Sequence, residues 1–286
     1  MSHNPILKKL LQPESISVLE LILEQDVALL GRLQKKQDDG VLVRNEPLSL
    51  EDYHSCFPVL KTKIDNFLGV QDISTPQLYE HSTNTKYKYY GLGAGVMAGG
   101  VLLGLYVDHH LIPTTSLSLI PLVMGHIKHQ GDDCEGTYVF GKIEINDLKR
   151  PREQILPIVG HEYVHHIQRE KGLLSLLDLI IRLNSTERLM LLEGHACGVQ
   201  RYLADQYAQE QDNEAFLYYN RLLDVPKLKR LYTWLCDQSG KKPLPKFEEK
   251  GFRSGLEVHA VGLGYFLVQE HDNGLSAYAD WLKTGN

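Results

Sequence analysis

A histidine pair inside an apolar segment constrains this chain more than any other feature. His161 and His165 lie four residues apart within residues 151–171, and Val164 and Ile167 belong to an apolar face of the same segment. Residues four apart share one face of an α-helix, so both imidazoles would point at one place. Burying two imidazoles without partners is costly. The segment is therefore predicted to be a helix that packs beside a group able to hydrogen-bond or coordinate both imidazole rings.

The segment His161-Glu162-Tyr163-Val164-His165 matches the pattern HExxH. On a helix, this spacing directs two imidazoles at one zinc ion, about 2.0–2.1 Å from each nitrogen. Glu162 lies about 100° round the helix from His161. From there its carboxylate can take a proton from a zinc-bound water without occupying the coordination shell. The pattern also arises by chance in helices rich in His and Glu, but the strand pattern before it favours a real site.

A catalytic zinc site needs a third protein ligand. The next predicted helix, residues 184–209, carries both Glu193 and His195. Glu193 shares a helix face with Leu189 and Ala196, where an unpaired carboxylate would be expensive unless it bound a metal. His195 points nearly the opposite way. We expect Glu193 to be the third ligand, with His195 as the alternative.

The stretch HEYVHHIQ, followed by EGHA, resembles the gluzincin branch of the zincin metallopeptidases. More narrowly, it looks like the predicted zinc-dependent proteases that carry HExxH and a later E-G-x-A. The resemblance covers about residues 136–205. It implies that His161, His165 and Glu193 bind zinc and that Glu162 is the general base.

The same resemblance implies an α+β fold. Its small mixed sheet would have an edge strand packed on the HExxH helix, with mainly helical N- and C-terminal parts. We expect that edge strand at residues 138–145, with an irregularity at Gly141, and a peptide substrate would pair along it. Many gluzincins also place an Asp four residues after the third ligand, where it orients a zinc histidine. This chain has Cys197 there, so another residue must do so.

Peptide hydrolysis also needs a donor for the developing oxyanion. His259 and Tyr265, in the segment EVHAVGLGYFLVQ, are the candidates, and Tyr202 is a weaker third. The alternative for each is a core residue of an apolar helix. His166, next to the motif, is expected at the surface or beside the metal ligands.

The N-terminal part shows helical periodicity without a chemical motif. Residues 14–36 and 49–67 predict amphipathic helices, the second capped by Ser49 with Asp52 three residues on. We therefore divide the chain into a helical N-terminal segment, residues 1–88, and a zincin-like domain, residues 89–286.

An uncharged, glycine-rich segment opens that second domain. Residues 89–107, YYGLGAGVMAGGVLLGLYV, contain six glycines, and a second uncharged run reaches residue 125. This length is near the lower limit for crossing a bilayer. Glycine is a poor helix former in water, and neither a Trp belt nor a Lys/Arg cluster flanks the run. A buried strand–turn–strand is favoured, and membrane association through residues 89–124 is the alternative.

Composition and charge exclude some classes of function and indicate the cellular compartment. The net charge of -6 argues against a general nucleic-acid binder. The four cysteines lie far apart without a CxxC, which excludes a disulfide framework and favours a reducing compartment. The N-terminus lacks the apolar stretch of a secretory signal, so we expect a cytoplasmic protein, or a membrane-associated one as the alternative.

These observations predict a zinc-dependent peptidase that cleaves peptide or protein substrates by Glu162-assisted attack of zinc-bound water. Two alternatives stay open. One is a membrane-associated zinc protease, and the other is a non-catalytic protein that keeps the zincin scaffold for interaction or regulation. The substrate sequence, the mode of cleavage and the oligomeric state are not indicated by the sequence.

Overall fold

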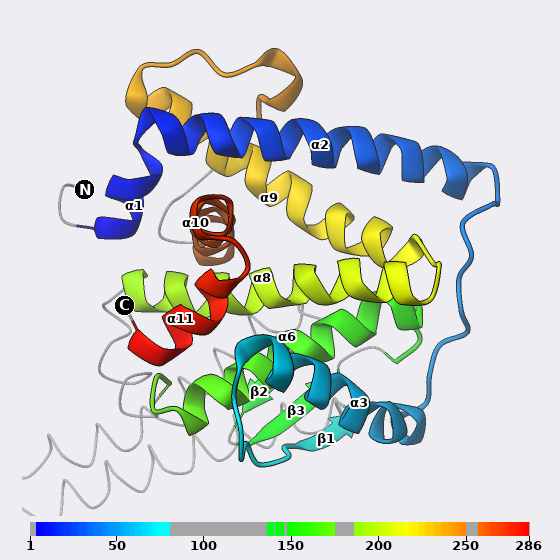
Figure 1. Cartoon of the computed structure of the whole chain (residues 1–286). Helices are drawn as coiled ribbons and strands as arrows, with labels where there is room; N and C mark the ends of the chain where they lie inside the picture. Colours follow the sequence, from blue (N-terminus) through cyan, green and yellow to red (C-terminus); the bar gives the residue numbers. More distant parts are fainter. Residues whose placement is uncertain are drawn as a thin grey trace, which may run out of the picture.

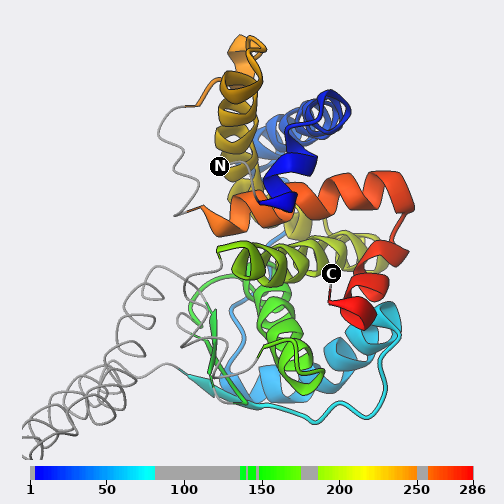
Figure 2. The ribbon, with the colours of Figure 1, turned by 90° about the vertical axis from the view of Figure 1, so that its left-hand side faces the viewer.

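The structure is a computed structural model that describes residues 4–80, 136–139, 141–145, 148–174, 186–249 and 257–285. Helices stack above a small sheet, with α8 between α6 on its sheet side and α10 on the other (Figures 1 and 2). In chain order the elements are α1 (Pro5–Leu10), α2 (Pro13–Asp38), α3 (Leu50–Leu68), β1 (Gln77–Glu80), β2 (Gly136–Val139), β3 (Lys142–Ile145), α6 (Arg152–Glu170), α8 (Thr186–Glu210), α9 (Ala215–Ser239), a 3-10 turn (Pro245–Phe247), α10 (Val258–Asn273) and α11 (Ser276–Thr284).

The three strands form one mixed sheet in the order β1-β3-β2. β1 runs parallel to β3, and β2 runs antiparallel to it. The prediction of one strand over residues 138–145 is wrong, because the chain reverses at Gly141, whose φ of 81° is in the region that favours glycine. β1 and β2 are therefore the two edge strands, β2 being the edge strand beside α6, and β3 is the central strand, with Ile143 and Ile145 buried. The expected α+β class with a small mixed sheet is confirmed.

Helix α6 is the structural centre of the fold. It begins after Pro151 and ends at Glu170, followed by Gly172 with a φ of 72°, in agreement with the predicted helix over residues 151–171. Every residue from Ile155 to Gln168 is buried, because the sheet and α3 cover one side and α8 the other. Figure 1 shows α6 running between the sheet and α8.

The N-terminal helices pack against the rest of the described chain. The predicted helices over residues 14–36 and 49–67 correspond to α2 and α3, and Ser49 caps α3 with a capping box. α2 lies along α9, α1 contacts α10, and α3 covers α6 and β1. Leu19 of α2 and Leu60 of α3 therefore share one hydrophobic core with Tyr163 of α6. The short β1 was not expected within the helical N-terminal segment.

Several sequence predictions lie outside the described residues. These are the domain boundary at residue 88, the apolar run over residues 89–124, and most of the apolar segment 173–183. Among the helices that the structure does describe, none has both the length and the apolarity needed to cross a bilayer.

Candidate metal centre

Three predicted ligands meet where α6 faces α8. His161 and His165 lie one turn apart on α6, each only 8% exposed, and Glu193 reaches them from α8. The two Nε2 atoms are 3.2 Å apart. Glu193 Oε2 is 3.4 Å from Nε2 of His161 and 3.3 Å from Nε2 of His165. In the described part of the chain, these residues form a His–His–Glu group that could hold a metal ion.

The spacing of these donors fits a tetrahedral ion. Ligands about 2.0–2.1 Å from a tetrahedral zinc lie about 3.3–3.4 Å from one another. The three measured donor–donor distances, 3.2, 3.3 and 3.4 Å, match one face of that tetrahedron. Two imidazole nitrogens and a carboxylate oxygen directed at one point repel one another unless a cation lies between them. Geometry and charge thus agree that the group could hold a cation.

Burial and the neighbouring charges also shift the pKa values of the three residues. Burial lowers the pKa of His161 to about 4. Burial would also lower the pKa of His165, but the nearby Glu193 carboxylate outweighs it and raises that pKa to about 9. The pKa of Glu193 lies well below its usual value because the charge of His165 outweighs burial. The Glu193 carboxylate and the His165 ring therefore stabilise each other's charged form.

Glu162 lies beside the ligands and against the edge strand. It is 7% exposed, and a Cβ built on Gly136 of β2 would lie 3.1 Å from its Cγ. The absence of a side chain at Gly136 lets the strand backbone approach, and the backbone N–H of Tyr138 donates to the carboxylate. Burial raises the pKa of Glu162 to about 7, while the charge of His165 opposes the rise. A carboxyl group with such a pKa can both take and give a proton near neutrality.

A close crossing of α8 and α10 brings His259 to the centre. A Cβ on Gly194 would lie 2.2 Å from the carbonyl carbon of Gly262, so the two helix backbones touch. This contact explains the glycine of the EGHA motif. His259, in the first turn of α10, places its Nε2 3.1 Å from Oε2 of Glu193, and its side chain stays 41% exposed. Its ring centroid is 6.4 Å from that of His161.

His195, the alternative third ligand, points away from the cluster. Its Nε2 lies 3.1 Å from the carbonyl oxygen of Tyr278 on α11, and its Nδ1 lies 3.2 Å from Nε2 of Gln168. Burial lowers the pKa of His195 to about 3, so the ring is neutral. The structure therefore places Glu193 in the cluster and gives His195 a different set of contacts.

Gln168 is the residue that sequence reasoning missed. Its Oε1 is 2.8 Å from Nδ1 of His165, one turn earlier on α6. The sequence predicted that some residue must replace the missing Asp at position 197, and Gln168 makes the required contact. Cys197 itself is buried, and burial raises the pKa of its thiol. The only sequence signal was a polar Gln three residues after His165 on a largely apolar helix.

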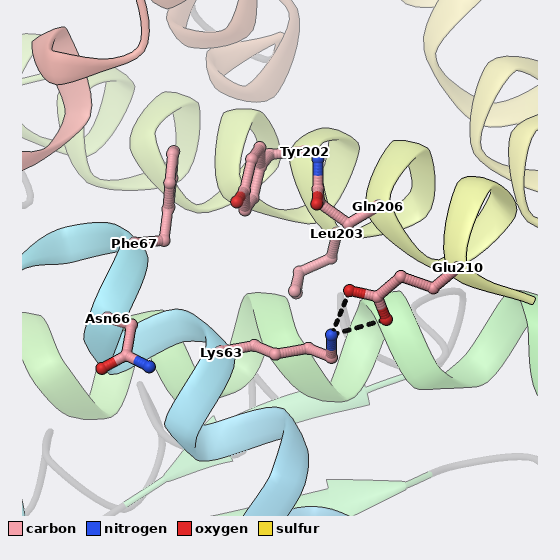
Figure 3. A pocket seen from close by; sticks show the side chains of 7 residues that line it. All are labelled: Lys63, Asn66, Phe67, Tyr202, Leu203, Gln206 and Glu210. Carbon is pink, nitrogen blue, oxygen red and sulfur yellow. Dashed lines mark hydrogen bonds and ion pairs between the residues drawn. The ribbon is translucent and has the colours of Figure 1, made fainter.

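The two tyrosines that were candidate oxyanion donors, Tyr265 and Tyr202, pack against aromatic residues outside the metal cluster. Tyr265 is half-buried on α10 with its ring 5.6 Å from that of Phe266, and burial raises its pKa. Tyr202 stacks on Phe67 with a centroid distance of 3.8 Å. It lines a hollow of about 300 Å³ between α3 and α8, and Lys63 and Glu210, which form an ion pair, line the same hollow (Figure 3). Neither tyrosine contacts the cluster among the described residues.

His166 ties α6 to the sheet region. Its Nδ1 lies 3.0 Å from the hydroxyl of Tyr138 on β2, and its Nε2 lies 3.0 Å from the carbonyl oxygen of Ser74. Arg169 donates to the same Tyr138 hydroxyl at 3.2 Å. These contacts fix β2 relative to the helix that carries the metal ligands. His166 is thus buried, not at the surface, and its hydrogen bonds go to Tyr138 and Ser74 instead of a metal ligand.

Comparisons of the chain with protein-family models, with curated proteins and with solved structures found no match. A functional assignment therefore depends on the chain's own residues, above all on the converging donors of His161, His165 and Glu193.

Proposed function

We propose that the chain is a zinc-dependent peptidase. The observation that carries the proposal is the convergence of His161, His165 and Glu193 at the spacing of a tetrahedral face, with Glu162 buried beside them. Two imidazoles and one carboxylate, with a fourth position left for water or substrate, are typical of catalytic zinc. Structural zinc sites are instead closed by four protein ligands, most often with cysteine among them.

In the proposed hydrolysis, the residues of the centre would hold zinc and Glu162 would move the proton. When bound, zinc supplies Lewis-acid polarisation and makes water acidic near pH 7. Glu162 takes the proton of the attacking water as the new C–O bond forms. It then delivers that proton to the amide nitrogen as the C–N bond breaks, which yields a carboxylic acid and an amine; near neutral pH the acid loses its proton and the amine takes one up. A pKa of about 7 suits a group that must do both.

The edge strand supports a peptide as the substrate. Within the described residues, β2 pairs with no strand besides β3. The N–H of Tyr138 already donates to Glu162, and the remaining backbone groups of the other edge of β2 could pair with an extended peptide. An extended peptide that adds to this edge would lie beside Glu162, because the carboxylate accepts from the backbone of Tyr138 in β2. This arrangement favours a peptide bond over a small ester or a sugar linkage.

His259 is the oxyanion donor that we favour over Tyr265. Its Nε2 lies at the edge of the cluster, 3.1 Å from Glu193, and its partly exposed ring can turn toward a bound substrate. Tyr265 lies six residues, about 1.7 turns, further along α10, and its charged neighbours are Lys9 and Glu187.

The test uses the full chain and two matched variants. Metal analysis of purified protein should show about one zinc per chain in the wild type, in Glu162→Gln and in Glu170→Gln. Hydrolysis of a mixed peptide library should fall about 100-fold or more in Glu162→Gln, because the general base is lost. Glu170 is an exposed residue at the end of the same helix, so Glu170→Gln should keep full activity. Undiminished hydrolysis by Glu162→Gln would refute the proposal. Stoichiometric zinc without any hydrolysis by the wild type would favour the non-catalytic alternative.

A further inference from the structure

A buried hydrogen-bond chain leads from the metal centre to the C-terminal helix. Gln168 is fully buried and touches three groups: its Oε1 lies 2.8 Å from His165 Nδ1, and its Nε2 lies 3.0 Å from the carbonyl oxygen of Leu192 and 3.2 Å from Nδ1 of His195. His195, also fully buried, continues the chain with Nε2 at 3.1 Å from the carbonyl oxygen of Tyr278. The chain thus joins α6, α8 and α11.

The two backbone carbonyls determine where the protons lie, because a carbonyl oxygen can only accept. The carbonyl of Leu192 requires the NH₂ end of Gln168, so the amide oxygen must face His165. Nδ1 of His165 is therefore the N–H donor. At the other end, the carbonyl of Tyr278 requires an N–H at Nε2 of His195. Nδ1 of His195 then carries the lone pair that accepts from Gln168.

This arrangement leaves Nε2 of His165 free to bind a metal. That atom lies 3.3 Å from Glu193 Oε2 and 3.2 Å from His161 Nε2. We propose that Gln168 is a positioning residue, which holds His165 in the Nδ1–H tautomer, and that His195 in turn holds Gln168. The inference rests on the metal centre of the proposed function.

The two histidine ligands are not held alike. Nδ1 of His161 is buried and has no hydrogen-bond partner among the described residues. His165 is therefore the ligand with a fixed ring, and the effect of Gln168 passes through this ligand alone. Groups that orient a metal-binding histidine in this way typically change metal affinity about 10–100-fold when they are removed.

An amide suits this position better than a carboxylate. A carboxylate could accept from His165, but it would face the carbonyl oxygen of Leu192 without a hydrogen to share and could not donate to His195. The amide of Gln168 satisfies all three neighbours at once. This difference supplies a conservative variant, Gln168→Glu, that keeps only the contact with His165.

The main experiment measures zinc affinity by competition with a chromophoric chelator, using the full chain. Gln168→Leu should raise the zinc Kd about 10–100-fold, because His165 loses its acceptor. Gln168→Glu should bind zinc more tightly than Gln168→Leu. The control is Thr233→Val, which removes another buried hydrogen bond, 3.1 Å to the carbonyl oxygen of Phe247 on a different part of the fold. Thr233→Val should lower the unfolding free energy and leave the zinc Kd unchanged.

A purely structural Gln168 would give a different result. Gln168→Leu would then unfold more easily and yet bind zinc as the wild type does, which would overturn the proposal. So would a zinc affinity of Gln168→Glu no better than that of Gln168→Leu. If the wild-type chain binds no zinc, the proposed function fails instead.

A measurement on the wild type covers the case in which the variants do not fold. Imidazole ¹⁵N NMR of the zinc-loaded chain, with signals assigned by single histidine substitutions, should show N–H at Nδ1 of His165 and at Nε2 of His195. An N–H at Nδ1 of His195 would reverse the Gln168 amide and refute the hydrogen-bond chain, whatever the variants do.

Discussion

Replacing Gly262 with alanine tests the crossing of α8 and α10 that brings His259 to Glu193. The new Cβ would lie 2.0 Å from the carbonyl oxygen of Met190 and 2.7 Å from both Cα and N of Gly194. All three are backbone atoms, so no side chain can turn aside and the helices must move apart. Such overpacking costs about 3 kcal/mol or more, and alanine returns about 1 kcal/mol of helix propensity. We expect Gly262→Ala to lose at least about 2 kcal/mol of unfolding free energy.

Gly31→Ala is the matched control. Gly31 also lies inside a helix, α2, but a Cβ there would meet nothing within 4 Å. Only the propensity gain remains, so this variant should be more stable than the wild type by about 0.5–1 kcal/mol. Glycine-to-alanine substitution is thus expected to lower the unfolding free energy at position 262 and to raise it at position 31.

Urea unfolding followed by circular dichroism measures both changes. The two variants should move the urea midpoint in opposite directions. The zinc Kd of Gly262→Ala should also rise, because Glu193 precedes the glycine that α10 contacts. A Gly262→Ala chain as stable as the wild type would refute the backbone contact between α8 and α10.

Three further predictions concern the centre and its surroundings. Metal analysis should find zinc lost from Glu193→Ala, whereas His195→Gln should still bind zinc, with an affinity weakened only through Gln168; the reverse pattern would make His195 the ligand. Folding lowers the pKa of His195 from 6.5 to about 3. As the pH drops below about 6.5, His195 is therefore protonated in the unfolded chain but not in the folded one. The contribution of the neutral ring to stability is then lost progressively toward pH 3. Acid unfolding of the wild type should therefore be steeper than that of His195→Gln by up to about 1.4 kcal/mol per pH unit, and equal slopes would contradict a buried neutral ring. On the best peptide found, His259→Gln should lower kcat about 10–100-fold while Tyr265→Phe leaves it unchanged; equal losses would return Tyr265 to the list of donors.

The ligand set could be predicted because each ligand depends on local periodicity. The spacing of His161 and His165 determines their common face as soon as a helix is assumed, and an acidic residue on a half-apolar face singled out Glu193. Gln168 could not be recognised in the same way. Its role depends on Leu192 and His195 of α8 and on the carbonyl of Tyr278 in α11, and no local pattern records those distant partners.

The hairpin at Gly141 shows a signal that was present but misread. The bulky residues Tyr138 and Phe140 occupy even positions, whereas Ile143 and Ile145 occupy odd ones. A single strand keeps its large side chains in one phase, so the change of phase marks a reversal between two strands. The short helices α1 and α11 left no comparable signal, because helices of this length are stable only through tertiary contacts.

The position of the donors on two different helices has a thermodynamic consequence. An ion held by α6 and α8 together would act as a cross-link between the layer that carries the sheet and the layer that carries α10. At a free-ion concentration a thousand times the Kd, such a ligand adds about 4 kcal/mol to the unfolding free energy. A chelator should then lower the Tm as well as the activity. Under that linkage, the fraction of chains that is folded depends on the supply of metal.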